Sequence, residues 1–188
     1  MAKIEKTGRP AIYPAPAALI SAYDENNKPN AMTAAWASNI CYQPPTVVVG
    51  IHSKRYTFEL IEKTQCFVVN LPAVDKVLET DYCGVVSGRD HDKFEETGFT
   101  AIKGSKVNAP LVKECPVNIE CKLLKQVNIG SHDAFFGEVV AVHYDEEMIN
   151  EKGVPDTLRG NLLAYGTGSY YSLKEEVGRH SFSKKKMK

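Results

Sequence analysis

Runs of apolar residues bounded by turn-forming residues predict several strands in the first half of the chain. The segment Ala17–Tyr23 (AALISAY) is apolar and leads into the turn DENNKPN, so Ala31–Ile40 (AMTAAWASNI) is predicted to return beside it as a hairpin. Two prolines precede the β-branched run TVVVGI at 46–51. A further apolar run, Cys66–Leu71 (CFVVNL), is stopped by Pro72. These segments predict a protein rich in β structure.

The most regular alternation lies in the second half of the chain. Apolar residues at 117, 119, 121 and 123 alternate with polar residues at 118, 120 and 122. The segment Ala134–Tyr144 (AFFGEVVAVHY) follows after a short loop at 130–133. Together they predict a long antiparallel hairpin.

Helical periodicity is confined to short stretches. Tyr56–Thr64 is predicted as a helix with Thr57 as its N-cap. A second helix begins near Ala73 and ends at about Gly88. Its predicted apolar face consists of Val74, Val77, Leu78, Tyr82 and Val85. The charged segment 88–99 is predicted to be a loop with one helical turn. Many antiparallel strands and few helices favour a small β-barrel with helices outside it over a doubly wound sheet.

Composition and charge narrow the class of protein. A chain of 188 residues has the size of one domain, and we expect 1–188 to form a single one. The 23 basic residues balance 23 acidic ones, which argues against a nucleic-acid binder. Five cysteines without C-x-x-C spacing argue against a disulfide framework or a zinc ribbon. The start of the chain lacks an apolar signal region, and no apolar run reaches the ~18 residues of a membrane helix. We therefore expect a cytoplasmic protein with no membrane partner.

One strand-to-helix turn concentrates hydroxyl groups and cations. Residues 50–61 read GIHSKRYTFELI, so Ser53, Lys54, Arg55 and Thr57 stand just before the predicted helix. A helix N-terminus presents unpaired N–H groups, and Lys and Arg can neutralise a phosphate. The turn therefore has the components of a phosphate site. From these residues alone, a solvated turn with a Thr cap and two surface cations is the commoner alternative. The chain has neither a Walker A loop nor a G-x-G-x-x-G motif in a βαβ unit.

Four stretches of the chain, taken in order, carry a resemblance to a known family. They are YPAPAALISAYDENNKPNAMTAAWAS (13–38), SKRYTFELI (53–61), DYCGVVSGRDHDKFEETGF (81–99), and APLVKECPVNIECKLL with GSHDAFFGEVVAVH (109–124 and 130–143). They resemble the flavin reductase-like family, also called the FMN-binding split barrel, and within it the flavoredoxin-like proteins. The resemblance implies a mainly β fold with flanking helices: a six-stranded antiparallel Greek-key split barrel. It also implies FMN bound at a homodimer interface, with its phosphate on the SKRYT turn.

The same resemblance implies cofactor contacts elsewhere in the chain. Along MTAAWAS the small residues let a flat ring approach the backbone, with a core or dimer-interface position as the alternative for the tryptophan. The residues expected near the cofactor, besides those of the turn, are Thr33, Ala34, Ala35, Trp36, Ser38, Asn70, Ser87, Gly88, Lys93 and Tyr171. For Asn70 a turn-initiating role is an equal alternative. Tyr171 or its neighbour Tyr170 covers the ring or meets the dimer partner, and packing of a terminal strand is the alternative.

His132 is the candidate catalytic residue. It lies in the predicted hairpin loop GSHD, and the resemblance implies that it points to the exposed face of the flavin. There an imidazole could orient a nicotinamide or stabilise negative charge on reduced flavin. The alternative is a solvent-exposed loop histidine. Asp90 and Asp92 are expected to brace Arg89 and Lys93, and no metal site is expected.

The residues and the resemblance together predict an FMN-binding flavoprotein. In the leading hypothesis it is a flavin reductase-like oxidoreductase that passes electrons from NAD(P)H or another donor to free flavin, ferric iron or a redox partner. Two alternatives stay open. One is a flavoredoxin-type electron carrier that does not use nicotinamide itself, and the other is a non-catalytic FMN-binding sensor.

Overall fold

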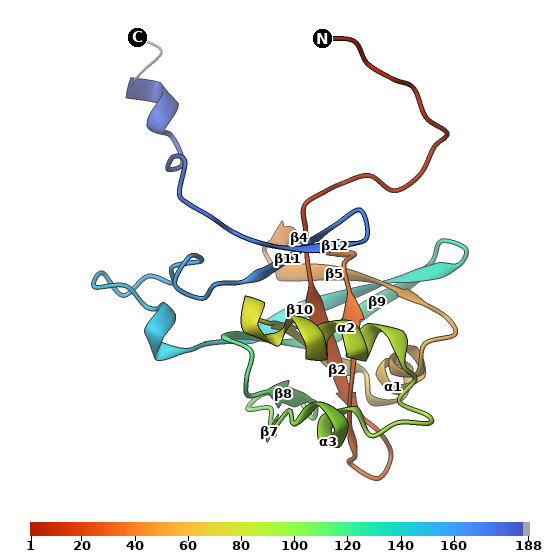
Figure 1. Ribbon diagram of the computed structural model, residues 1–188. Helices are drawn as coiled ribbons and strands as arrows, with labels where there is room; N and C mark the ends of the chain where they lie inside the picture. Colours follow the sequence, from red (N-terminus) through yellow and green to blue (C-terminus); the bar gives the residue numbers. More distant parts are fainter. Residues whose placement is uncertain (186–188) are drawn as a thin grey trace.

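A computed structural model describes residues 1–185, so the last three residues of the predicted domain lie outside it (Figure 1). The main sheet has seven antiparallel strands in the order β3-β2-β6-β9-β10-β5-β4. Its strands are β2 (Ala18–Tyr23), β3 (Pro29–Ala34), β4 (Ala37–Tyr42), β5 (Pro45–His52), β6 (Cys66–Leu71), β9 (Val117–Asn128) and β10 (His132–Tyr144).

Smaller elements surround this sheet. A three-stranded sheet joins β1 (Ala15–Pro16), β11 (Leu163–Gly166) and β12 (Ser169–Ser172), and β7 (Ala101–Lys103) pairs with β8 (Pro110–Val112). The α-helices are α1 (Tyr56–Thr64), α2 (Val77–Val85) and α3 (Lys93–Thr97), and 3-10 turns span Val74–Lys76, Glu146–Met148 and Phe182–Lys185. Figure 1 shows both terminal segments extending away from the body at the same end. The mainly β fold with few helices agrees with the prediction. No helix in residues 1–185 is long and apolar enough to cross a membrane.

A two-residue link forces the seven-stranded sheet to curl. β3 and β4 are its two edge strands, yet only Ala35 and Trp36 separate them in sequence. If the sheet were flat, six strand spacings would hold its edges roughly 29 Å apart. Three Cα–Cα steps, from Ala34 to Ala37, span at most about 11 Å. The edges must therefore lie close together, and because no ladder joins them the curled sheet stays split along this seam.

Alternate residues of the inner strands serve two different cores. In β2, Ile20 points into the curled sheet, where it joins Val49, Phe67 and Phe135. Its neighbour Leu19 points outward into a second cluster, formed with residues of α2, α3 and β8. Successive side chains of a strand face opposite sides, so a strand covered on both faces is mostly apolar, and its buried polar residues, here Ser21 and Asn70, are hydrogen-bonded. That is why AALISAY and CFVVNL lack a polar face.

The predicted hairpin of the second half is confirmed. β9 and β10 form the longest ladder of the sheet, with register shifts at Phe136/Gly137 and Val139/Ala141. A Cβ on Gly137 would lie 2.6 Å from Cζ of Phe67 and 2.9 Å from Cβ of Cys121, so only glycine fits there. The main sheet has seven strands and is not closed, so the six-stranded barrel is not confirmed. One other expectation is corrected: the single strand predicted for Ala31–Ile40 is broken at Ala35–Trp36, where the chain crosses the seam.

The predicted apolar face of the second helix is wrong. Leu78 and Val85 are largely exposed, and the residues that α2 buries are Thr80 and Cys83. Small residues face the sheet because the helix packs closely on β3: a Cβ on Gly84 would lie 3.2 Å from Cβ of Thr33. The helix ends at Val85, before Gly88.

The N-cap prediction for α1 is also corrected. Its N-cap is Arg55, which makes no side-chain cap bond. Thr57 is buried in the first turn, where its Oγ1 accepts a hydrogen bond from Nδ2 of Asn30 at 2.7 Å. The hydroxyl therefore ties α1 to β3 instead of capping the helix.

Glu120 on β9 is a fully buried carboxylate with a complete set of donors. It accepts hydrogen bonds from the backbone N–H groups of Ser105, Lys106 and Val107 and from the Ser105 hydroxyl, at 2.7–2.9 Å. Nε2 of His143 lies 2.6 Å from its Oε1. Burial alone would raise the pKa of Glu120, but His143, Ser105 and the backbone amides outweigh it and lower the pKa to about 2. This carboxylate holds the 104–107 loop against β9.

Glu120→Gln is expected to lower the free energy of unfolding at pH 7 by roughly 3 kcal/mol, because its NH₂ group would face N–H donors in a buried site. The folded pKa of Glu120 lies below the ordinary glutamate pKa of 4.5, so the stabilisation by Glu120 is present above about pH 4.5. It is lost as the pH falls from 4.5 toward 2. The difference between wild type and variant, measured by urea unfolding, should shrink over this range. The exposed Glu151→Gln is the control, and a difference independent of pH would contradict the role given to Glu120.

Candidate functional site

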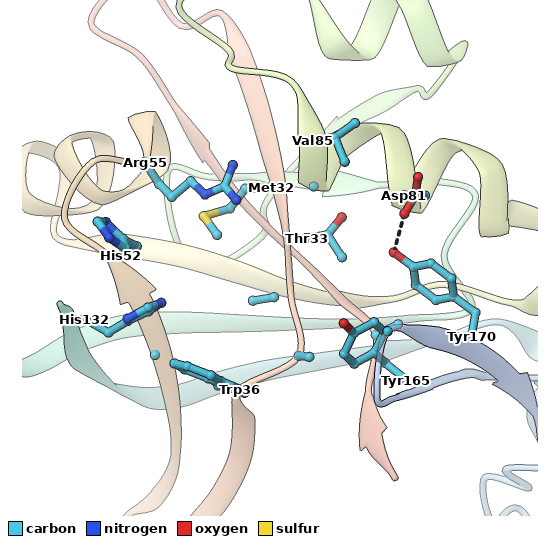
Figure 2. Close-up of a pocket in the computed structure, with 16 residues that line it drawn as sticks. Met32, Thr33, Trp36, His52, Arg55, Asp81, Val85, His132, Tyr165 and Tyr170 are labelled. Atoms are coloured by element: carbon cyan, nitrogen blue, oxygen red, sulfur yellow. Dashed lines mark hydrogen bonds between the residues drawn. The ribbon is translucent and has the colours of Figure 1, made fainter. Parts of the chain in front are cut away.

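Six of the predicted site residues surround a pocket at the seam of the sheet, which we call the seam pocket. The pocket has a volume of about 430 Å³. Its walls come from the β3–β4 link, the ends of β5 and β10, α2 and the β11–β12 hairpin (Figure 2). The predicted residues that line it are Thr33, Ala34, Ala35, Trp36, Arg55 and His132. Because Ala34 and Ala35 carry only methyl groups, a planar ligand can approach the backbone of the link.

An aromatic group closes one end of this pocket. The ring centroid of His132 lies 4.6 Å from that of Trp36 and 4.9 Å from that of His52. Trp36 packs on Gly50, whose N–H donates to the Trp36 carbonyl at 2.8 Å. Burial, followed by the charges of His52 and Arg55, lowers the pKa of His132. The imidazole is therefore neutral at pH 7, with Nδ1 2.9 Å from the Ser131 hydroxyl.

Two tyrosines and a carboxylate form the opposite end (Figure 2). The Tyr170 hydroxyl donates a hydrogen bond to Oδ1 of Asp81 on α2 at 3.0 Å, and its ring meets that of Tyr165 edge to face. Burial and the bond to Asp81 raise the pKa of Tyr170 well above its usual value, so it stays protonated. The bond ties the β11–β12 hairpin to α2.

A cleft of about 60 Å³ adjoins the pocket, and Met32 and Arg55 line both. Its walls are the first turn of α1 and the loop at 86–88, and the predicted residues Lys54, Thr57, Ser87, Gly88 and Lys93 lie here. In the described part of the chain, the N–H groups of Tyr56 and Thr57 and the side-chain cations of Lys54 and Arg55 have no protein partner. Free N–H groups and free cations at a helix N-terminus favour an anion.

Lys93 is a buried cation beside this cleft. It is only 3% exposed, and its Nζ donates to the carbonyl oxygens of Ala31 at 2.9 Å and Cys83 at 2.8 Å. No carboxylate of residues 1–185 forms an ion pair with it. Burial lowers the pKa of Lys93 to about 8. Since a buried charge without a counterion is costly, an anion in the cleft would supply the missing partner and keep Lys93 protonated.

Gly88 and Asn30 shape the base of the cleft. A Cβ on Gly88 would lie 1.9 Å from Oδ1 of Asn30, so a side chain at this position would collide with β3. The same Oδ1 is buried and has no hydrogen-bond partner. Asn30 thus leaves a free polar atom at the wall formed by Gly88 while its Nδ2 holds Thr57. Oδ1 can only accept, so it would suit a hydroxyl group of a ligand, whereas the Lys93 ammonium and the free amides form a donor set that fits the phosphate end of a mononucleotide.

The structure places four predicted residues away from the pocket and the cleft. Asn70 is buried in the core, where it bonds the Leu19 carbonyl, the Ser21 hydroxyl, the Val112 amide and the Asn118 side chain at 2.8–3.0 Å. Ser53 is exposed, and Ser38 lies on β4 beside an adjoining apolar hollow of about 590 Å³. Tyr171 faces solvent, because alternate residues of β12 point to opposite sides and Tyr170 takes the side of the pocket.

The sequence analysis missed several residues that line the site. His52, Asp81 and Tyr165 line the pocket, and Asn30 braces the cleft. A polar residue at the end of an apolar strand was a usable signal for His52. Asp81 and Asn30 gave no signal, because their roles depend on segments distant in sequence.

The expected ion pairs of Asp90 and Asp92 with Arg89 and Lys93, within the SGRDHDKF loop, are replaced by other contacts in the structure. Asp92 caps α3 by accepting from the Glu95 amide, and its other oxygen pairs with Lys28 at 2.9 Å. Arg89 pairs with Glu59 on α1. Within residues 1–185, no group of three or more His, Cys, Asp or Glu side chains is placed to hold a metal ion.

Comparison with known proteins gives consistent matches. Residues 9–174 match the flavin reductase like domain. The flavoredoxin of Desulfovibrio vulgaris (Miyazaki F) is 33% identical, with a TM-score of 0.93 over 97% of this chain and 100% of that one. The flavoredoxin from Methanosarcina acetivorans is 31% identical, with a TM-score of 0.92 over the whole of both chains.

A third solved structure is similar over nearly the same length. It is an FMN-binding protein from Thermus thermophilus, 29% identical, with a TM-score of 0.80 over 95% of this chain and 97% of that one. Residues 9–174, which match the flavin reductase like domain, include all the residues that line the seam pocket and the cleft at α1. The chain therefore belongs to the flavin reductase-like family and has a flavin-related oxidoreductase role.

Proposed function

We propose that the protein binds FMN and passes electrons from NAD(P)H or another donor to free flavin, ferric iron or a redox partner. The observation that carries the proposal is the buried, unpaired ammonium of Lys93 beside free amides and the free Arg55 guanidinium, next to a pocket lined by small residues. The name of the FMN-binding relative from Thermus thermophilus supports the same ligand.

The residues of the cleft and those of the pocket would bind different parts of this cofactor. Lys54, Arg55, Lys93 and the amides of the first turn of α1 would hold the phosphate. Thr33, Ala34, Ala35 and Trp36 would line the ring, and the Asp81–Tyr170 bond would close the end opposite His132. Bound FMN would supply hydride and single-electron chemistry that no side chain here provides.

Arg55→Ala is expected to weaken FMN binding about ten- to a hundredfold, because one charge-assisted phosphate contact is worth roughly 1.5–3 kcal/mol. Riboflavin lacks the phosphate, so its affinity should change little. Fluorescence titration of both flavins measures this. Arg159→Ala removes an exposed arginine distant from the site and serves as the control. Equal weakening of both flavins in the Arg55 variant would refute its contact with the phosphate.

His132 is proposed to act at the open end of the pocket. Its neutral imidazole can orient a carboxamide of an incoming donor or donate a hydrogen bond to a reduced ring. His52 and Trp36 hold the imidazole at this end.

His132→Ala is expected to slow reduction of bound FMN by NADH or NADPH by roughly tenfold to a hundredfold. This is at the low end of the range for proton-transfer groups, because His132 would only position the nicotinamide and polarise the flavin ring. FMN affinity should be nearly unchanged. Anaerobic stopped-flow bleaching measures the rate, with His91→Ala on the α2–α3 loop as the control.

Reduction by dithionite but by neither nucleotide would exclude direct nicotinamide use. The electron-carrier alternative, which the similarity to two flavoredoxins favours, would then lead.

We also propose that the protein is a homodimer. Ile40 and Tyr42 of β4 and Val142 and Tyr144 of β10 are exposed, and they line a second apolar hollow, of about 910 Å³. A second copy would cover this surface, and with it Trp36 and the 165–173 segment. Sedimentation equilibrium at micromolar concentration should give about twice the 20.8 kDa mass of the chain. A monomer that still binds FMN would contradict the proposal.

A further inference from the structure

Arg89 bridges the two walls of the cleft from outside it. The residue lies on the loop between α2 and α3, and its guanidinium reaches across to the start of α1. Nη1 donates to the Lys54 carbonyl at 3.1 Å, and Nη2 pairs with Glu59. The guanidinium carbon lies 5.3 Å from the centroid of the Tyr56 ring. One side chain thus contacts three residues of a segment 30–35 positions away.

Hydrogen bonds within residues 87–91 hold the loop that carries Arg89. The Arg89 N–H donates to the Ser87 hydroxyl at 3.2 Å, and the Ser87 carbonyl accepts from the N–H groups of Asp90 and His91, both at 3.1 Å. Movement of Arg89 would therefore move Ser87 and Gly88, which line the cleft. On the other side, Lys54 and Tyr56 also line it. The contacts of Arg89 consequently fix one wall relative to the other.

The charge of Arg89 is already matched within the protein. Its guanidinium pairs with Glu59, and neither residue lines the cleft or the seam pocket. Arg55 lies on the turn before α1, which Arg89 contacts. Its side chain lines both the cleft and the seam pocket and has no protein partner in the described chain. The two arginines therefore have different tasks: Arg55 is free for a ligand, whereas Arg89 is committed to the fold.

We propose that Arg89 and Glu59 form a clamp that positions the phosphate cleft and so sets the affinity for the phosphate end of a flavin mononucleotide without touching it. This inference rests on the proposed function. Arg89 is a positioning residue, because it acts through the Lys54–Thr57 turn and the Ser87–Gly88 loop. A cleft held in its binding geometry loses less conformational freedom when the ligand binds, which raises affinity.

Four variants test the clamp: Glu59→Gln, which keeps the shape and removes the charge, Arg89→Gln, the double variant of these two, and Arg89→Lys. Each single change is expected to weaken FMN binding about three- to tenfold, in keeping with an ion pair that is partly exposed. Riboflavin affinity should stay within about twofold, because riboflavin does not use the cleft. The double variant should be no weaker than the worse single variant, because either change releases the same clamp. Arg89→Lys should recover only part of the affinity, since Lys cannot donate in fork geometry.

A second measurement does not need flavin. Hydrogen exchange of the free protein should show faster exchange in both single variants at the hydrogen-bonded amides of the two segments, which are those of Lys54, Arg55, Phe58, Arg89, Asp90 and His91. Arg179→Ala, which removes an exposed arginine paired with Glu176 at 3.0 Å, is the matched control and should change neither the exchange nor the flavin affinities.

Several results would overturn the clamp. Equal weakening of FMN and riboflavin would indicate general loosening of the fold, and unchanged FMN affinity would reduce the pair to an ordinary surface contact. Additive effects in the double variant would show that Arg89 and Glu59 act separately. If the wild-type protein bound neither flavin, the proposed function would fail, and hydrogen exchange would still decide whether the clamp orders the two segments.

Discussion

The two-residue link between β3 and β4 is the constraint on which the rest of the molecule depends. It joins the two edges of a seven-stranded sheet, so the sheet has to curl. Curling encloses one face of β2 and β6, and α2, α3 and β8 cover the other face of β2. No ladder joins the two edges, and the seam pocket opens where Ala35 and Trp36 cross between them. The architecture and the site are consequences of one short connection.

Buried polar groups fall into two kinds in this structure. Glu120 and Asn70 are fully used: every oxygen or amide group of these side chains meets a partner within the protein, and they hold loops and strands together. Lys93 and Asn30 are incompletely used, and both lie beside the cleft at α1. Since an unmatched buried polar group lowers stability, its position indicates where a ligand completes the set. The Lys93 ammonium, which pairs with no carboxylate of residues 1–185, marks the anion end of the site, whereas Oδ1 of Asn30 would need a hydrogen-bond donor from the ligand.

The arginines near the site show how a fold can divide identical side chains between two tasks. Arg89 gives its charge to Glu59 and its donors to the turn, whereas the charge of Arg55 stays free at the edge of the pocket. Both lie in charged segments that look alike in sequence. Only contacts between segments 30–35 positions apart distinguish them.

The sequence by itself determined the strands of the β9–β10 hairpin, the doubly buried strands β2 and β6, the turn before α1 and the family. These features depend on local periodicity, on turn residues and on short motifs, all of which can be recognised along the chain. It also pointed to His132 and Lys93 as candidates, because their motifs resemble those of the family, and the structure places them at the pocket and the cleft.

The tertiary structure alone decided the break at Ala35–Trp36, the burial of Thr80 and Cys83 in place of Leu78 and Val85, and the choice of Tyr170 over Tyr171. It also placed Asn70 in the core and paired Arg89 with Glu59. The physical reason is common to all of them. Which face of a helix or strand is buried, and which partner satisfies a polar group, depends on segments that are distant in sequence and adjacent only after the sheet has curled.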